Sequence, residues 1–215
     1  MDFSPWSSPW GGQRYNSFNR ILRETFGARV YKVGLRLERF YQEALDIPGV
    51  VGLSSATRPD CAHDDVLGLI AEIARHTYLW LALGLESMHD KTLRWVNRRH
   101  NLREFLDAAG RSKARALRLC VHLILGFPTE TREEILQTPH LLNRVGIDGV
   151  KLHNLHVIRH TALEEIYRRG GMSLLSWDEY VSLLVDFIER LAPSMVIHRL
   201  SGETYRDLTV APAGP

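Results

Sequence analysis

The chain has 215 residues, of which 45% are hydrophobic and 24% charged, a composition typical of a soluble globular domain with a buried core. Its formal net charge of +2 is too small to indicate a nucleic-acid or acidic-membrane surface. No apolar run approaches the ~20 residues that span a membrane, and the first residues lack the basic-then-apolar pattern of a signal peptide. We therefore expect a cytoplasmic protein without membrane contact.

The N-terminal part is predicted to contain an arm and three short elements. Residues 1–14 are rich in Ser, Pro, Gly and Trp and predict a mobile arm. Residues 16–26 predict an amphipathic helix that ends at a glycine. A strand at Val30–Leu35 and a helix at Leu37–Leu45 follow. This strand runs directly into the helix without a βα loop, which indicates either a tight turn or a lost segment.

From there the pattern alternates regularly between strands and helices. Strands are predicted at Gly49–Ser55, Tyr78–Leu85, Leu117–Leu125, Val150–Val157 and Met195–Leu200. Helices are predicted at Asp65–Arg75, Asp90–Asn97, Leu102–Ser112, Glu133–Val145, Ala162–Arg169 and Trp177–Leu191. Short apolar strands that alternate with helices favour an α/β fold with a parallel sheet, here an open or partial βα barrel. We predict a barrel domain over residues 15–205 and a tail over residues 206–215.

The segment around Gly126 predicts a ligand site. Leu119–Leu125 is apolar except for His122, and the chain then breaks at Gly126 and Pro128 before Thr129, which can cap the next helix. Ligands bind at such strand-to-helix turns in βα folds, where backbone N–H groups suit an anionic or polar group. The alternative is a well-formed turn without a ligand.

Polar residues recur near the ends of the predicted strands, which supports a ligand site there. The residues concerned are Thr57, Arg58, Asp60, Glu86, Ser87, Gly126, Glu130, His153, His156, His198 and Arg199. Any single buried histidine is also explained by a hydrogen bond to the backbone. The basic residues between Arg94 and His100 suit a carboxylate or phosphate, or form a solvated helix end. His153 and His156 fall on opposite faces of one predicted strand, which argues against a metal site between them.

The cysteine pattern excludes a local metal motif. The sequence contains two cysteines, Cys61 and Cys120, and no CxxC or CxxxCxxC spacing. Both lie in or beside predicted buried strands, where we interpret them as small hydrophobic residues.

Six segments together resemble the radical SAM superfamily, and specifically the YhcC-type proteins, relatives of the Elongator catalytic-subunit group. In family order they are GGQRYNSFNRILRETFGARVYKV, GVVGLSSATRPDC, LALGLESMHDKTLRWVNRRHN, HLILGFPTETREE, GVKLHNLHVIRHTALE and VIHRLSGE. The resemblance implies a partial, open (βα)6-type barrel. It also implies a [4Fe-4S] cluster, held by a three-cysteine loop after the first strand, which binds S-adenosylmethionine and cleaves it to a 5′-deoxyadenosyl radical.

The chain departs from this family pattern where the cysteine loop belongs. After Leu35 the family continues into that loop and a second strand, whereas this sequence passes to RLERFYQEALDIPG. The resemblance thus implies that the cluster loop and the region around the second strand are missing, through gene decay, a gene-model error or deliberate shortening. The C-terminus also stops early relative to the family. Ala82 and Glu86 stand where relatives usually have Glu and Gln.

The expected consequence is a family member without the family's radical chemistry. Without three thiolates we expect no bound cluster, and therefore no metal site and no catalytic residue. By resemblance, candidate contacts to an S-adenosylmethionine-like molecule remain at Ser87, Arg98, Ile124, Gly126, Leu155 and His156. We further expect marginal stability, because the missing strand leaves a gap in the sheet.

Two other interpretations remain open from the residues alone. One is a cluster-free binding or scaffolding module that docks on RNA, for which a basic patch at Arg94–His100 is the local support. The other is a metal-dependent barrel hydrolase that uses His122, His153, His156 or His198.

Overall fold

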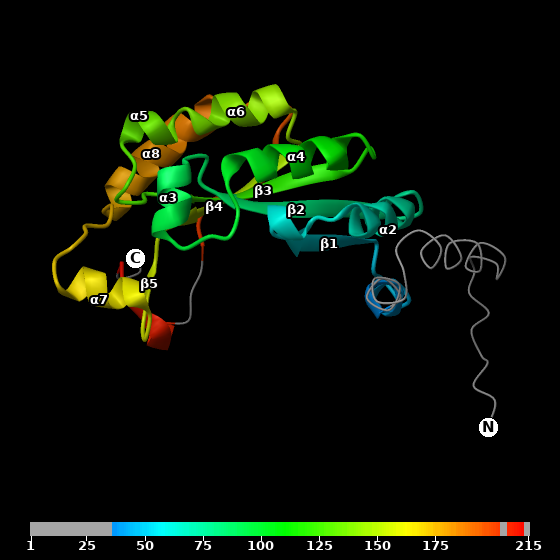
Figure 1. Cartoon of the computed structure of the whole chain (residues 1–215), viewed down its shortest axis with the longest axis horizontal. Coiled ribbons are helices and arrows are strands. Elements are labelled where there is room, and N and C mark those ends of the chain that lie inside the picture. Colours follow the sequence, from blue (N-terminus) through cyan, green and yellow to red (C-terminus); the bar gives the residue numbers. More distant parts are fainter. Residues whose placement is uncertain (1–35, 203–205, 213–215) are drawn as a thin grey trace. The chain divides into compact units, whose positions relative to one another are not determined.

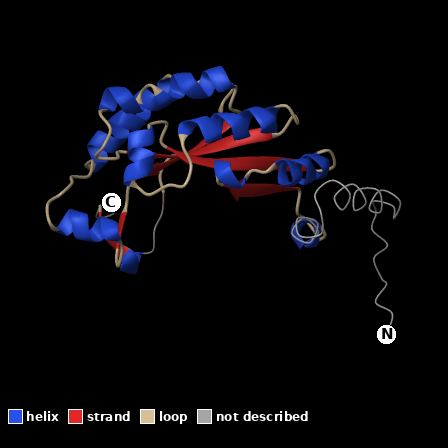
Figure 2. Cartoon of the chain, in the orientation of Figure 1, coloured by secondary structure: helices blue, strands red, loops and turns tan. Residues whose placement is uncertain are grey.

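The computed structural model describes residues 36–202 and 206–212 (Figures 1 and 2). These residues form two compact units. Of these residues, one unit comprises 36–53 and 63–79, and the other comprises 54–62, 80–202 and 206–212. The predicted arm, the helix over 16–26 and the strand at Val30–Leu35 lie outside the described residues. Among the described helices, none is both long and apolar enough to cross a membrane.

The first unit contains two described helices. One covers residues 36–45, in agreement with the prediction for Leu37–Leu45. The other is α2 (Asp64–Ala74), which begins with two acidic residues, where the helix dipole favours negative charge. Its apolar residues Leu67, Leu69 and Ile70 are buried. Strand β1 (Gly52–Thr57) crosses the boundary between the two units.

The second unit is built on a parallel sheet. The strand order is β1-β2-β3-β4-β6, with β2 at Tyr78–Glu86, β3 at Arg118–Leu125, β4 at Gly149–Asn154 and β6 at Val196–Arg199. The pairs β2–β3, β3–β4 and β4–β6 are all parallel. This arrangement confirms the predicted α/β fold with a parallel sheet.

Helices cover one face of this sheet (Figure 1). They are α3 (Asp90–Trp95), α4 (Leu102–Lys113), α5 (Arg132–Ile135), α6 (Thr138–Val145) and α8 (Trp177–Glu189). Alternate leucines of the strands are fully buried, as Leu81, Leu83 and Leu123 show, and Phe105 of α4 and Phe187 of α8 are buried as well. The opposite face, called the helix-free face because none of these five described helices lies on it, carries the other strand residues. They are apolar at one end (Trp80, Ala82 and Cys120) and polar further along.

Two predicted elements are divided in the structure. The predicted strand Val150–Val157 ends at Asn154, whose side chain accepts a hydrogen bond from Gly202 N (3.2 Å). The short β5 (Val157–Ile158) then pairs antiparallel with β7 (Thr209–Ala211), a strand that was not predicted. The predicted helix Glu133–Val145 becomes α5 and α6, since Pro139 is tolerated only in the first turn of a helix. The remaining elements are η1 (Pro59–Cys61), α7 (Ala162–Arg168) and η2 (Arg206–Leu208).

A capping box fixes the start of α4. The Asn101 side chain accepts from Glu104 N (3.0 Å), and the Glu104 carboxylate accepts from Asn101 N (2.8 Å). We expect Asn101→Ala to lower the free energy of unfolding by about 1 kcal/mol, because a backbone N–H loses its partner. Urea denaturation would measure this loss. Asn101→Asp keeps the acceptor and should leave the urea midpoint near that of the wild type; equal losses in both variants would contradict the capping role.

Candidate functional site

The carboxyl ends of β2, β3 and β4 lie side by side, because these three strands are parallel neighbours. Ser87 follows β2, Gly126 follows β3, and Leu155 follows β4. A hydrogen bond from Leu155 N to Leu125 O (3.3 Å) extends the β3–β4 pairing by one step. The fold therefore gathers at one sheet edge most of the residues that the sequence selected for a ligand site.

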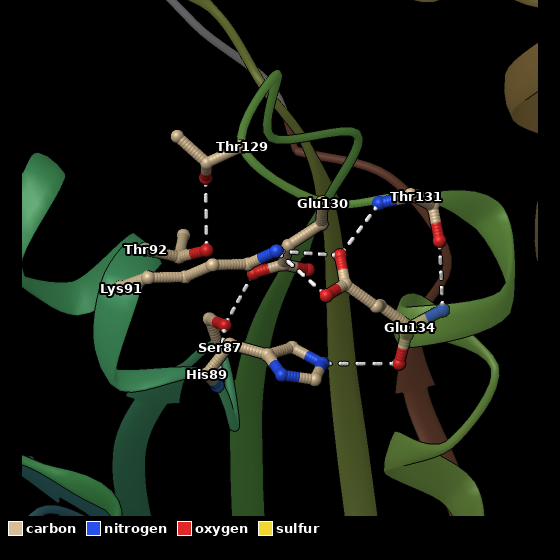
Figure 3. Close-up of polar contacts among 8 residues, drawn as sticks. All are labelled: Ser87, His89, Lys91, Thr92, Thr129, Glu130, Thr131 and Glu134. Carbon is tan, nitrogen blue, oxygen red and sulfur yellow. Dashed lines mark hydrogen bonds and ion pairs between the residues drawn. The ribbon is translucent and has the colours of Figure 1, made fainter.

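Ser87 is buried, and its hydroxyl makes two hydrogen bonds (Figure 3). Its hydroxyl donates to the Glu130 carboxylate and accepts from His89 N (2.9 Å). Glu130 lies on the loop after β3, so this contact ties the ends of β2 and β3 together. A ligand group that accepted a hydrogen bond from Ser87 would have to replace Glu130.

Further contacts join the same two loops. Lys91 Nζ donates to both carboxylate oxygens of Glu134 (2.6 and 2.7 Å), and the hydrogen bond from Lys91 is the main cause of the lowered pKa of Glu134. The His89 ring lies 3.1 Å from Glu134 O, and the hydroxyls of Thr92 and Thr129 are 2.8 Å apart. Sequence reasoning missed this network, because its partners lie 37 to 45 positions apart and carry no local motif.

The cap of the helix after β3 is Thr131, not Thr129. The Thr131 hydroxyl accepts from Glu134 N (3.2 Å), and the Glu134 carboxylate accepts from Thr131 N (2.9 Å). Thr129 instead pairs with Thr92. The prediction that Thr129 caps this helix is therefore wrong by two residues.

Arg98 lies against the end of β2. Its Nη2 donates to Gly84 O and to Glu86 Oε1, each at 3.0 Å. Burial raises the pKa of Glu86, and the positive charge of Arg98 opposes this rise. Glu86 has a φ of 65°, a left-handed conformation uncommon for a non-glycine residue, and a side chain at Gly84 would collide with Arg98 Nη2. The buried His100 ring contacts Leu85 O at 3.3 Å, so the predicted basic patch is divided between the interior and the surface.

Position 126 requires a glycine, because of its backbone conformation and because of a neighbouring side chain. Its φ is 91°, and an added Cβ would lie 2.9 Å from Leu175 Cδ1. Ile124 precedes it on the helix-free face and pairs with His153 of β4. On the next strand end, Asn154 Nδ2 donates to His156 Nε2 (3.0 Å), and burial lowers the pKa of His156. Since β4 ends at Asn154, the predicted strand alternation does not extend to His156.

The thiols do not fit an iron–sulfur cluster. Cys120 lies within β3 and is buried, which raises its pKa to about 11. Cys61 is exposed on η1, where its Sγ accepts from Arg58 Nη2 at 3.7 Å. These are the only cysteines of the sequence, and cluster ligation requires several thiolates that converge. Within the described ranges, no three His, Cys, Asp or Glu side chains are grouped to hold a metal ion.

The parallel sheet, its one-sided helix layer and the polar strand ends define an α/β protein of the open-barrel class. The Radical SAM superfamily profile matches residues 22–142, and the Radical_SAM C-terminal domain profile matches residues 147–214. The chain therefore belongs to the radical SAM superfamily, a family that typically uses a [4Fe-4S] cluster and S-adenosylmethionine.

Relatives agree with this assignment. The chain is 35% identical to the uncharacterized protein YtqA of Bacillus subtilis, with 82% of this chain and 55% of YtqA aligned. It is also 35% identical to protein YhcC of Escherichia coli, over 82% of this chain and 57% of YhcC. The chain thus spans just over half the length of these relatives. The fold matches the archaeal Elp3 of Methanocaldococcus infernus with a TM-score of 0.67 at 17% identity, over 90% of this chain and 45% of Elp3.

Proposed function

We propose that this chain is a cluster-free member of the radical SAM superfamily that binds an S-adenosylmethionine-like small molecule at the strand ends without cleaving it. The observation that carries the proposal is the placement of the cysteines: one thiol is buried within β3 and the other lies exposed on η1. Neither belongs to a loop that offers a second thiolate.

The strand ends supply polar groups for such a ligand. Arg98 Nε is buried and has no hydrogen-bond partner among the described residues, which leaves one charged donor for a ligand carboxylate. Ile124, Gly126 and Leu155 provide apolar and backbone surface beside it. Ser87 and His156 are engaged with Glu130 and Asn154, so we assign them a positioning role unless the ligand displaces these partners.

Anaerobic iron–sulfur reconstitution tests the absence of the cluster. We expect no stoichiometric iron or sulfide to remain with the chain, and no 5′-deoxyadenosine to form from S-adenosylmethionine. A radical SAM enzyme with an intact three-cysteine loop, reconstituted in parallel, serves as the positive control. Roughly four irons per chain, the content of a [4Fe-4S] cluster, would overturn this part of the proposal.

Calorimetric titration with S-adenosylmethionine, without added iron, tests the binding part. We expect binding to the wild-type chain and at least about tenfold weaker binding to Arg98→Gln, since a charged donor is lost. Arg103→Gln removes an exposed arginine of α4 and should leave binding unchanged. Absence of binding to the wild type, or equal effects of the two variants, would contradict this assignment.

RNA docking and metal-dependent hydrolysis stay predictions from the sequence. RNA docking gains no added support from the structure, because the basic residues at Arg94–His100 are divided between interior and surface. The rings of His122 and His153 lie 6.0 Å apart by their centroids, and no carboxylate within the described ranges joins them in a metal-binding group.

A further inference from the structure

The strand register brings basic residues into a row on the helix-free face. Gly84 of β2 pairs with His122 of β3, His122 pairs with Lys151 of β4, and Lys151 pairs with Arg199 of β6. Residues paired across neighbouring strands point to the same face of a sheet. His122, Lys151 and Arg199 are therefore neighbours, although 77 positions separate the first from the last.

An irregularity in β6 adds a second basic group to this face. The register shifts between Val150 and Lys151, so that Ile197 pairs with Val150 and Arg199 with Lys151. A bulge of this kind re-aims a side chain beside a site. The His198 ring lies over Gly149, where an added Cβ would come within 2.8 Å of His198 Nε2, and it packs edge-on against Trp80 at 4.4 Å between ring centroids.

We define the basic row as His122, Lys151, His153, His198 and Arg199. Over the described part of the chain, no salt bridge joins Lys151 or Arg199 to a carboxylate. The charged or titratable neighbours that perturb His122 are Lys151, His153, Arg199 and His198, so every one of them is basic. Glu86 lies beyond this row, where Arg98 already neutralises it.

Several hydrogen-bonding nitrogens of the row have no partner. His122 Nε2, His198 Nε2 and Arg199 Nε are buried and lack a hydrogen bond among the described residues. Buried polar atoms are normally satisfied, so this concentration in one place requires an explanation such as a ligand. The Arg199 guanidinium, which can only donate, also lies against the ring nitrogens of His153.

We propose that the basic row binds the phosphate group of a small molecule. Lys151 and Arg199 supply fixed positive charge, and the unpartnered nitrogens of His122, His198 and Arg199 supply directional contacts to a tetrahedral oxyanion. The residues of the row are half-buried, which suits a phosphate-bearing small molecule better than a nucleic-acid backbone spread over an exposed surface. This site adjoins the one proposed at the strand ends, because His153 of the row pairs with Ile124, but it requires neither cluster nor S-adenosylmethionine.

Titration of the chain with inorganic pyrophosphate, without prior iron–sulfur reconstitution, tests the site. A second titration uses orthophosphate in place of pyrophosphate. We expect saturable binding by calorimetry, weakened at least about tenfold in Lys151→Gln, because a charged partner is lost. Arg144 is an exposed basic residue of α6. The variant Arg144→Gln is therefore the matched control and should bind as the wild type does. Equal binding by the two variants, or a wild-type Kd weaker than about 1 mM, would overturn the proposal.

A second readout does not depend on any variant being folded. In the wild-type chain, pyrophosphate should shift the imidazole NMR signals of His122, His153 and His198, while the exposed His140 of α6 stays unchanged. Uniform small shifts of all histidines would indicate screening alone and contradict a site. If single-stranded RNA shifted the same signals and pyrophosphate did not, the row would be a nucleic-acid contact and the proposal would be wrong. Failure of S-adenosylmethionine binding would leave these results unaffected.

Discussion

Gly126→Ala should lower the free energy of unfolding by about 2–4 kcal/mol. Two costs add at this position, since the backbone has a φ of 91° and the new Cβ would lie 2.9 Å from Leu175 Cδ1. A non-glycine residue in such a conformation costs roughly 1–3 kcal/mol, and overpacking adds a similar amount unless Leu175 moves. Urea denaturation of the variant and the wild type would measure the difference.

Gly110→Ala is the matched control for this prediction. Gly110 lies in α4, its φ is not positive, and an added Cβ would meet nothing within 4 Å. Alanine is the better helix former by about 1 kcal/mol, so this variant should be more stable than the wild type. If both substitutions changed stability in the same direction, the special role of Gly126 would be refuted. A loss in Gly126→Ala without a change in ligand binding would assign Gly126 to the turn alone.

Local sequence patterns predicted the sheet well. The apolar run up to Leu125 followed by Gly126 marked both a buried strand and its sharp end, because strand burial and a positive φ each leave a signal in neighbouring residues. The helix prediction at Leu102–Ser112 was correct within one residue, and Asn101 and Glu104 form its capping box.

The errors occurred where distant parts of the chain decide the structure. The predicted strand Val150–Val157 continues the apolar pattern, yet β5 leaves the sheet to pair with β7, some fifty positions later. Likewise, Ser87 was chosen as a ligand contact, but Glu130 occupies its hydroxyl across 43 positions. Such contacts depend on which loops meet at the sheet edge, and single-sequence periodicity carries no information about that.

The basic row illustrates the same limit for function. His153, His198 and Arg199 were visible as polar strand residues, but their grouping with Lys151 depends on the strand order β3-β4-β6 and on the register shift in β6. The order of residues along the strand could not predict that His198 and Arg199 lie on one face, since regular alternation puts consecutive residues on opposite faces. The bulge reverses that expectation.

The basic row should also make stability depend on pH below neutrality. Burial, reinforced by Lys151 and other basic neighbours, lowers the pKa of His122 to about 4, and burial with Arg199 lowers the pKa of His153 to about 4. The ordinary histidine pKa is 6.5, so between these values the unfolded chain binds protons that the folded chain excludes. The stability that comes from keeping these two histidines uncharged is therefore fully present above about pH 6.5, and it is lost as the pH falls toward 4.

The size of this loss follows from the two shifts. Each corresponds to at most roughly 3 kcal/mol, and partial solvent access reduces it to about 1–2 kcal/mol per histidine. We therefore expect the free energy of unfolding to fall by about 2–4 kcal/mol between pH 7 and pH 4. Burial lowers the pKa of His198 and His156 in the same direction, whereas the raised pKa of Glu86 offsets part of the loss.

Urea midpoints measured across this pH range in a buffer without phosphate would test the prediction. His122→Gln removes one titrating group and should flatten the pH dependence by about half, because the uncharged amide binds no proton in either state. His140→Gln, on the exposed surface of α6, should retain the wild-type slope. Identical slopes in all three chains would show that the basic row does not exclude protons. Added pyrophosphate should flatten the wild-type curve as well, since a bound anion stabilises the protonated imidazoles that the empty row destabilises.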